Sequence, residues 1–148
     1  MRSTLPLTAA FIALAALGAQ PLWAQDAPSA REQAAQQAAE AWLQLLAEGR
    51  YEESWQAAST SFRSAVTAAM WTSQAASIET QLGPLQSRRL ESAEYTTEVP
   101  NAPAGEYIVL TYTSAFANLP AAREVVATYL EDDEWKVTGY FIQPPQDQ

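Results

Sequence analysis

The sequence predicts an α+β domain in which three N-terminal helices cover one face of a four-stranded antiparallel sheet. Three observations lead to this fold class. Apolar residues recur at helical spacing before Gly83-Pro84, and they alternate with polar residues in most of the chain after it. A polar cluster at residues 131–134 separates two strand-like runs and marks a hairpin. The helical patterns all precede the strand patterns, so the two kinds of element are segregated along the chain.

The N-terminus is expected to be a secretory signal peptide, residues 1–24, that takes no part in the fold. Met1 and Arg2 give a basic start, and Leu5–Leu17 is an uncharged apolar run. This run is shorter than the ~20 residues that a membrane span needs, and Ala24 is a small residue at which cleavage fits. An uncleaved N-terminal anchor is the alternative. We expect an exported bacterial protein, periplasmic or secreted, without a stable membrane span after removal of the signal. The chain then divides into a lead-in (25–29), a single α+β domain (30–143) and a loose tail (144–148).

The composition excludes several classes of function. The chain has 17 acidic and 8 basic residues, a net charge of −9, which argues against nucleic acid or anionic lipid as a partner. It contains no histidine, which removes the Ser-His-Asp triad and histidine metal sites. It contains no cysteine, which removes thiol chemistry. Neither a metal nor another cofactor is expected, and the acidic runs at 52–53 and 131–134 are interpreted as solvated.

Three helices are predicted before Gly83. The first follows a capping box formed by Ser29 and Glu32 and ends at Gly49. The second covers Tyr51–Ala58, and the third runs from Thr60 to Leu82. The apolar stripe of the third helix consists of Phe62, Val66, Met70, Ile78 and Leu82, with Trp71 beside it.

The sheet is predicted from an extended stretch at 84–100 and three strands, Glu106–Phe116, Arg123–Glu131 and Glu134–Gln143. In the extended stretch the adjacent Arg88 and Arg89 must point to opposite faces. A loop of two or four residues at the last hairpin gives one register. That register pairs Leu130 with Trp135, Tyr129 with Lys136, Thr128 with Val137, Val126 with Gly139 and Val125 with Tyr140. It therefore places Phe141 on the core face and Tyr129 and Tyr140 on the outer face.

Several motifs occur in a fixed order along the chain. They are Gly49-Arg50-Tyr51-Glu52-Glu53-Ser54-Trp55, Trp71, Leu82-Gly83, Pro103-Ala104-Gly105-Glu106-Tyr107-Ile108-Val109-Leu110 and Trp135-Lys136-Val137-Thr138-Gly139-Tyr140-Phe141-Ile142. Together they resemble the bacterial family catalogued as domain of unknown function 4019, over nearly the whole chain after the signal. The resemblance implies an exported protein with a cystatin-like or nuclear-transport-factor-2-like fold. It implies no established activity and no catalytic residues. The sequence Asp132-Asp133-Glu134 departs from the family pattern, in which a Gly-containing turn is usual.

The aromatic residues supply one candidate ligand site. Tryptophans from the three helices and the last strand are expected to converge, and the simpler interpretation is that they form the core. Trp71 lies off the stripe of its helix, however. The alternative is that Trp55, Trp71 and Tyr112 line an opening between the helices and the sheet, where a small apolar ligand enters.

The outer face of the sheet supplies a candidate interaction surface, made of Tyr107, Val109, Val125, Tyr129, Tyr140 and Ile142. A solvated sheet is the simpler interpretation. Three tyrosines beside several aliphatic side chains are nevertheless more than a monomer normally exposes. The partners expected for this surface are a second copy of the chain, giving a homodimer, or an envelope protein.

The sequence thus favours an exported, non-catalytic interaction module that self-associates through the outer sheet face. A carrier of a small apolar ligand in a helix–sheet cavity is the first alternative. A cofactor-free acid–base enzyme is the second, and it would need an Asp or Glu buried beside a Tyr within a pocket.

Overall fold

The predicted α+β class is confirmed by the structure, a computed structural model that describes residues 28–145. The helices are α1 (Ala30–Ala47), α2 (Tyr51–Ala57), α3 (Thr60–Ala65) and α4 (Ala68–Leu82), and the strands are β1 (Leu85–Thr96), β2 (Tyr107–Phe116), β3 (Leu119–Glu131) and β4 (Glu134–Gln143). The strands form one antiparallel sheet in the order β1-β2-β3-β4. The predicted signal peptide, most of the lead-in and the last three residues of the tail lie outside the described residues.

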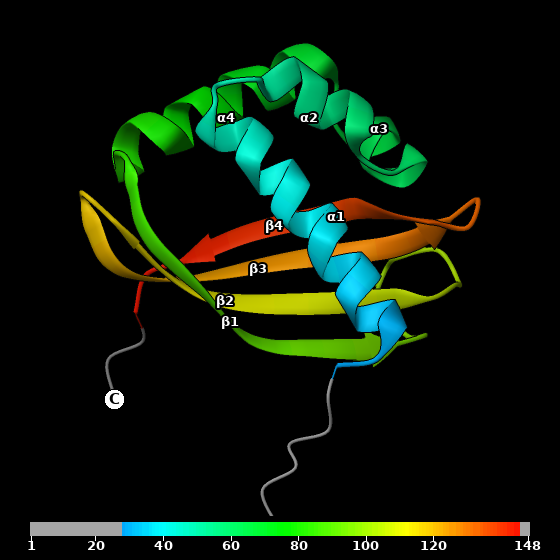
Figure 1. Cartoon of the computed structure of the whole chain (residues 1–148). Coiled ribbons are helices and arrows are strands. Elements are labelled where there is room, and N and C mark those ends of the chain that lie inside the picture. Colours follow the sequence, from blue (N-terminus) through cyan, green and yellow to red (C-terminus); the bar gives the residue numbers. More distant parts are fainter. Residues whose placement is uncertain (1–27, 146–148) are drawn as a thin grey trace, which may run out of the picture.

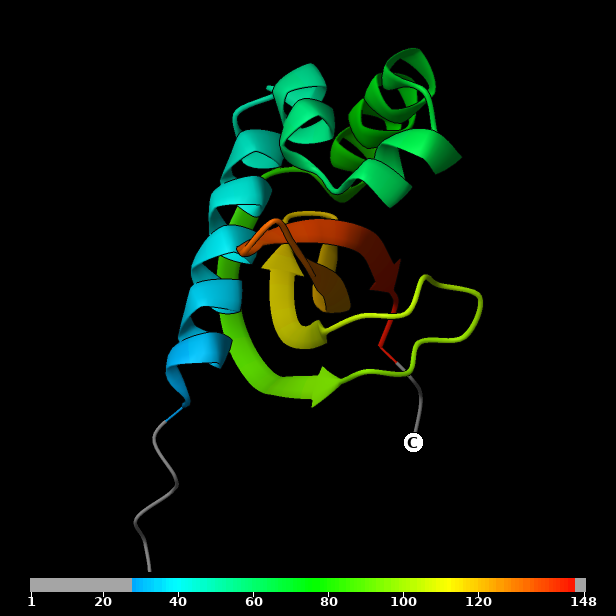
Figure 2. The same cartoon turned by 90° about the vertical axis from the view of Figure 1, so that its right-hand side faces the viewer.

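The helices form a layer on one side of the sheet. Helix α1 crosses the strands diagonally and contacts all four of them (Figure 1). Helices α2, α3 and α4 lie together above β4, and Figure 2 shows how strongly the sheet curves beneath this layer. Between residues 28 and 145, no helix combines the length and the apolar character that a membrane crossing requires.

Helix α1 begins with the predicted capping box. The Ser29 hydroxyl accepts a hydrogen bond from the Glu32 amide at 3.2 Å, and the Glu32 carboxylate accepts one from the Ser29 amide at 2.7 Å. The two bonds satisfy backbone donors that the first turn of a helix leaves free. The face that α1 turns to the sheet is buried and consists of Ala35, Ala39, Trp42, Leu43 and Leu46.

The long third helix predicted from Thr60 to Leu82 is wrong, because it is divided into α3 and α4. Val66 has extended backbone angles, and its carbonyl accepts a hydrogen bond from the Trp55 indole at 2.7 Å. The Thr67 hydroxyl then caps a new helix by accepting a bond from the Met70 amide. The interruption shifts the helical phase, so Trp71 is buried and Met70 is 55 % exposed.

The predicted hairpin between β3 and β4 has a two-residue turn. Asp132 and Asp133 both have positive φ, 52° and 64°, between the paired residues Glu131 and Glu134. This is the geometry of a type I′ turn, whose right-handed twist matches that of the strands. Glycine adopts positive φ without a Cβ clash, which accounts for its use at such turns.

Replacing Asp133 with Gly should raise the free energy of unfolding by about 0.5–1 kcal/mol, because it removes left-handed backbone strain from an exposed turn. Chemical denaturation of the two proteins measures the change. Asp133→Ala, which retains a Cβ and loses the local polar side chain, should be less stable than wild type. A Gly variant no more stable than the Ala variant would contradict this account.

The predicted register is correct at the turn and wrong further along β4. Leu130 pairs with Trp135 and Thr128 pairs with Val137, as expected, but Val126 pairs with Tyr140 rather than with Gly139. A β-bulge at Thr138 adds one unpaired residue to β4. Because side chains alternate along a strand, one added residue exchanges the two faces beyond it.

Candidate functional site

The four strands each contribute one polar side chain to a buried network on the helix-facing side of the sheet. These side chains are Arg88 from β1, Ser114 from β2, Glu124 from β3 and Tyr140 from β4. The side chain of Glu124 is fully buried, and that of Arg88 is 18 % exposed. Alternation along β1, β2 and β3 turns the first three side chains inward, and the β-bulge in β4 turns Tyr140 inward.

Glu124 is the centre of the network, and four donors surround its carboxylate. Arg88 donates from Nε to Oε1 at 2.8 Å and from Nη2 to Oε2 at 3.1 Å. Ser114 donates its hydroxyl to Oε1, and Tyr140 donates its hydroxyl to Oε2 at 2.7 Å. A carboxylate offers about four lone-pair positions. The protein itself therefore occupies the hydrogen-bonding capacity of Glu124.

Tyr140 is held in its protonated form. Burial, followed by the charge of Glu124, raises the pKa of Tyr140 far above its ordinary value. The Tyr140 ring also packs against Trp42, with ring centroids 5.3 Å apart. The side chain thus connects the polar network to the aromatic core.

A pocket of about 330 Å³ lies over this network, between the ends of α1 and α4 and the sheet. We call it the α1–α4 pocket. Its apolar wall consists of Leu43, Leu46, Ala47, Pro84, Leu85 and Phe116, and its polar wall consists of Glu79, Arg88 and Tyr140. A mostly apolar lining with a few convergent polar groups is typical of small-molecule sites, and the volume lies at the small end of their range.

Glu79 is the polar group of the pocket wall with the fewest protein contacts. Its carboxylate makes no hydrogen bond or ion pair within residues 28–145. Burial raises the pKa of Glu79, the nearby charge of Glu124 raises it further, and Arg88 partly opposes this. Glu79 is therefore the group in the pocket best able to accept a hydrogen bond or exchange a proton.

The three predicted ligand-binding residues do not line this pocket. Trp71 is 6 % exposed, donates its indole N–H to Ser54, and packs edge-on against Phe62. Trp55 is half-buried and bonded to the Val66 carbonyl. Tyr112 is 1 % exposed, and its hydroxyl has no hydrogen-bond partner among the described residues. Burial is the main reason that the pKa of Tyr112 is raised. In this structure all three are core residues or support the core, the simpler of the two interpretations.

The predicted outer face is only partly formed. Tyr140 and Ile142 lie on the helix-facing side because of the bulge, and Phe141, expected in the core, is 59 % exposed. The placement of these three side chains was therefore predicted wrongly. Val109, Val125 and Tyr129 remain half-buried on the outer face.

Tyr107 also lies on the outer face, but its own chain covers it. Its hydroxyl donates to the Pro103 carbonyl, its ring lies 4.9 Å from that of Tyr129, and the residue is 1 % exposed. The loop before β2 thus occupies part of the surface that was expected to meet a partner.

Sequence reasoning missed Glu79 and Glu124, although one signal was available for the second. Glu124 stands at an inward position of β3, in alternation with Val126 and Thr128. A charged residue at such a position needs a buried partner. Arg88 and Arg89 had to face opposite sides, so one of them was available to pair with it. No comparable signal marks Glu79, which follows Ile78 on an amphipathic helix.

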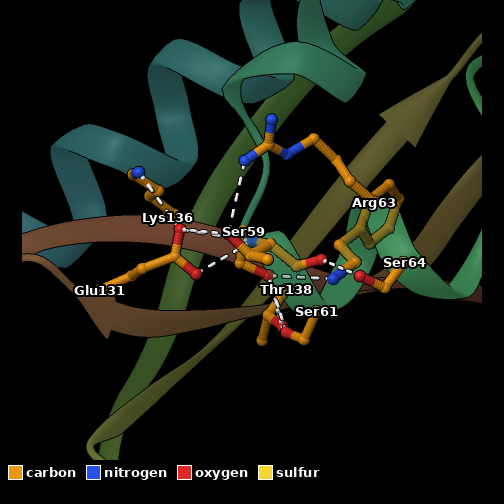
Figure 3. Close-up of polar contacts among 9 residues, drawn as sticks. Ser59, Ser61, Arg63, Ser64, Glu131, Lys136 and Thr138 are labelled. Atoms are coloured by element: carbon orange, nitrogen blue, oxygen red, sulfur yellow. Dashed lines mark hydrogen bonds and ion pairs between the residues drawn. The ribbon is translucent and has the colours of Figure 1, made fainter.

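A second polar cluster joins α3 to the β3–β4 hairpin (Figure 3). The hydroxyls of Ser59, Ser61 and Thr138 lie 2.9–3.0 Å from one another and form a closed triangle. The Glu131 carboxylate accepts bonds from the Thr60 amide and hydroxyl and from Lys136. These bonds lower the pKa of Glu131 below its usual range, the Thr60 amide contributing most.

The bulge residue Thr138 is one corner of this triangle, and the Ser59 amide donates to the neighbouring Val137 carbonyl at 2.9 Å. The cluster therefore fixes the bulge against the helices, and its groups satisfy one another. We interpret it as structural.

Replacing Thr138 with Val should lower the free energy of unfolding by about 1–2 kcal/mol, because a part-buried hydroxyl triangle loses one member while the side-chain shape is kept. Denaturant unfolding measures the change. The matched control is Thr111→Val on the outer face of β2, which should change stability by less than about 0.5 kcal/mol. Equal effects of the two substitutions would show that the triangle does not stabilise the bulge.

The fold and the pocket define a class: small α+β proteins with a helix layer above one antiparallel sheet and a pocket between the two. The sequence model of the family described as "Protein of unknown function (DUF4019)" matches residues 38–140, and the chain belongs to this family. The matched range contains Glu79, Arg88, Glu124 and Tyr140. No curated protein matches the chain. Within residues 28–145, no group of three or more acidic side chains is arranged to hold a metal ion.

Proposed function

We propose that this protein is an exported, non-catalytic binding protein that holds a small, largely apolar molecule in the α1–α4 pocket. The observation that supports it is the pocket itself, about 330 Å³ in volume and bounded by six apolar residues and three polar ones. Export rests on the basic start and apolar run of the N-terminal sequence. We therefore favour the ligand-carrier hypothesis over self-association. The ligand site proposed is the α1–α4 pocket and not the opening expected at Trp55, Trp71 and Tyr112.

An acid–base enzyme is less well supported, although Glu124 and Tyr140 form the pair that such an enzyme would require. A general base needs a lone pair directed at the substrate. Both oxygens of Glu124 already accept two bonds each, and Tyr140 is held protonated. The geometry favours a network that rigidifies the pocket floor over one that transfers protons.

Self-association through the outer sheet face remains a proposal, on a smaller surface. Phe141 is 59 % exposed and pairs with Val125, which lies beside Thr111 on the next strand. Under this second proposal the mature protein sediments as a dimer, and Phe141→Ser makes it a monomer. A monomer in both cases would remove the homodimer.

The neutral fluorescent compound N-phenyl-1-naphthylamine tests the pocket. It should bind at a single saturable site. Ala47→Trp should weaken binding by about tenfold or more, since Ala47 is exposed, lines the pocket and can be enlarged into it. Ala34→Trp, at an exposed alanine of the same helix away from the pocket, is the control and should stay within about twofold of wild type. Absence of saturable binding, or equal losses in the two variants, would contradict the proposal.

A further inference from the structure

We propose that the molecule bound in the α1–α4 pocket carries a protonated amine on a short apolar chain, and that Glu79 binds this amine. The inference rests on the proposed function, because it concerns the ligand of the same pocket. It follows from the balance of charge, from the hydrogen-bonding groups still free and from the lining of the pocket.

The charge balance of the pocket is negative. Three charged side chains contribute to it: Glu79 and Arg88 on the wall, and Glu124 directly beneath. Arg88 and Glu124 form a bidentate ion pair, so their charges offset each other. The charge of Glu79 is left over. An anion would meet the charge of Glu79 beside an Arg88 whose own charge Glu124 already offsets, whereas a cation finds an uncompensated carboxylate.

Glu79 is poorly solvated and has no protein partner. Its raised pKa has burial as the main cause, which means that the carboxylate has lost part of its hydration. No donor within residues 28–145 replaces that water. A carboxylate in this condition gains more from a cationic ligand than a fully hydrated one does, because less water has to be displaced.

Tyr140 on the polar wall also suits a ligand that donates a hydrogen bond rather than one that accepts it. Tyr140 gives its only hydroxyl proton to Glu124, so toward a ligand its oxygen can only accept. Tyr140 and Phe116 both line the pocket, and aromatic side chains attract cations. The aliphatic wall formed by Leu43, Leu46 and Leu85 suits an alkyl chain. The volume of about 330 Å³ is that of a small-molecule site.

Three eight-carbon compounds with different head groups provide the test: n-octylammonium, 1-octanol and octanoate. Isothermal titration calorimetry with the wild-type protein should give the tightest binding for octylammonium, by about tenfold over octanol, and the weakest for octanoate. This order is opposite to the one expected if Arg88 were the recognition group.

The decisive variant is Glu79→Gln, which keeps the size and polarity of the side chain and removes its charge. It should lower octylammonium affinity to about that of octanol while leaving octanol affinity within about twofold of wild type. Glu52→Gln, at an exposed glutamate in the first turn of α2, is the matched control and should change neither.

The outcomes separate the two proposals. If none of the three compounds binds and Ala47→Trp does not affect N-phenyl-1-naphthylamine, the pocket is not a ligand site and both proposals fail. If octanol or octanoate binds as tightly as octylammonium, or if the preference for the amine survives Glu79→Gln, the amine inference is overturned while the pocket stands.

Discussion

Replacing Arg88 with Met should lower the free energy of unfolding by about 3–5 kcal/mol, because Glu124 then remains fully buried without its counter-ion. Met fills a similar volume, so the loss reflects the uncompensated charge rather than a cavity. Denaturant unfolding of the two proteins measures the loss.

The double variant Arg88→Met, Glu124→Leu is the control for this experiment. Removing both charges together should recover most of the lost stability, since a well-packed apolar pair often equals a buried ion pair. The expected residual cost comes from Tyr140 and Ser114, which both lose their acceptor. A double variant as unstable as Arg88→Met would show that the side-chain volumes, and not the charge, determine the effect.

Replacing Trp42 with Ala should cost about 3–5 kcal/mol, the usual range for a large aromatic side chain in a core. Trp42 is 2 % exposed and packs against Trp71 at 5.5 Å, Tyr140 at 5.3 Å and Phe62 at 6.4 Å between ring centroids. Its indole N–H donates to the Ser54 carbonyl at 2.8 Å. Thermal or denaturant unfolding checks the size of the loss.

Trp42→Phe separates packing from hydrogen bonding at this position. It retains a ring against Trp71 and Tyr140 but leaves the buried Ser54 carbonyl without this donor, so it should cost about 1–3 kcal/mol. The Trp42 ring also packs against Tyr140, which lines the α1–α4 pocket. A Trp42→Ala protein as stable as wild type would contradict the assignment of this residue to the core.

The sequence predicted the parts of the fold that depend on local patterns. The capping box at Ser29 and Glu32 and the pairing of Leu130 with Trp135 at the last turn are confirmed, because each depends on neighbours along the chain. The break between α3 and α4 was missed. It depends on a hydrogen bond between the Trp55 indole and the Val66 carbonyl. The spacing of apolar residues within 60–82 cannot predict a contact with a residue outside that range.

The candidate pocket could not be assembled from the sequence for a related reason. Glu124 and Tyr140 meet only because the bulge turns Tyr140 inward, and the bulge depends on hydroxyls brought together from α3 and β4. Glu79 becomes distinctive through what surrounds it, a wall made by α1, α4 and the sheet. Neither its residue type nor its position on the helix predicts this environment.

The extra residue in β4 also affects how relatives of this chain should be compared. A homologue with one residue fewer between Val137 and Tyr140 would direct its phenol toward solvent and its phenylalanine toward the helices, even with an otherwise identical strand. Insertions and deletions at this position therefore decide which chemistry the cavity contains. Alignments that close a gap here would equate side chains that point in opposite directions.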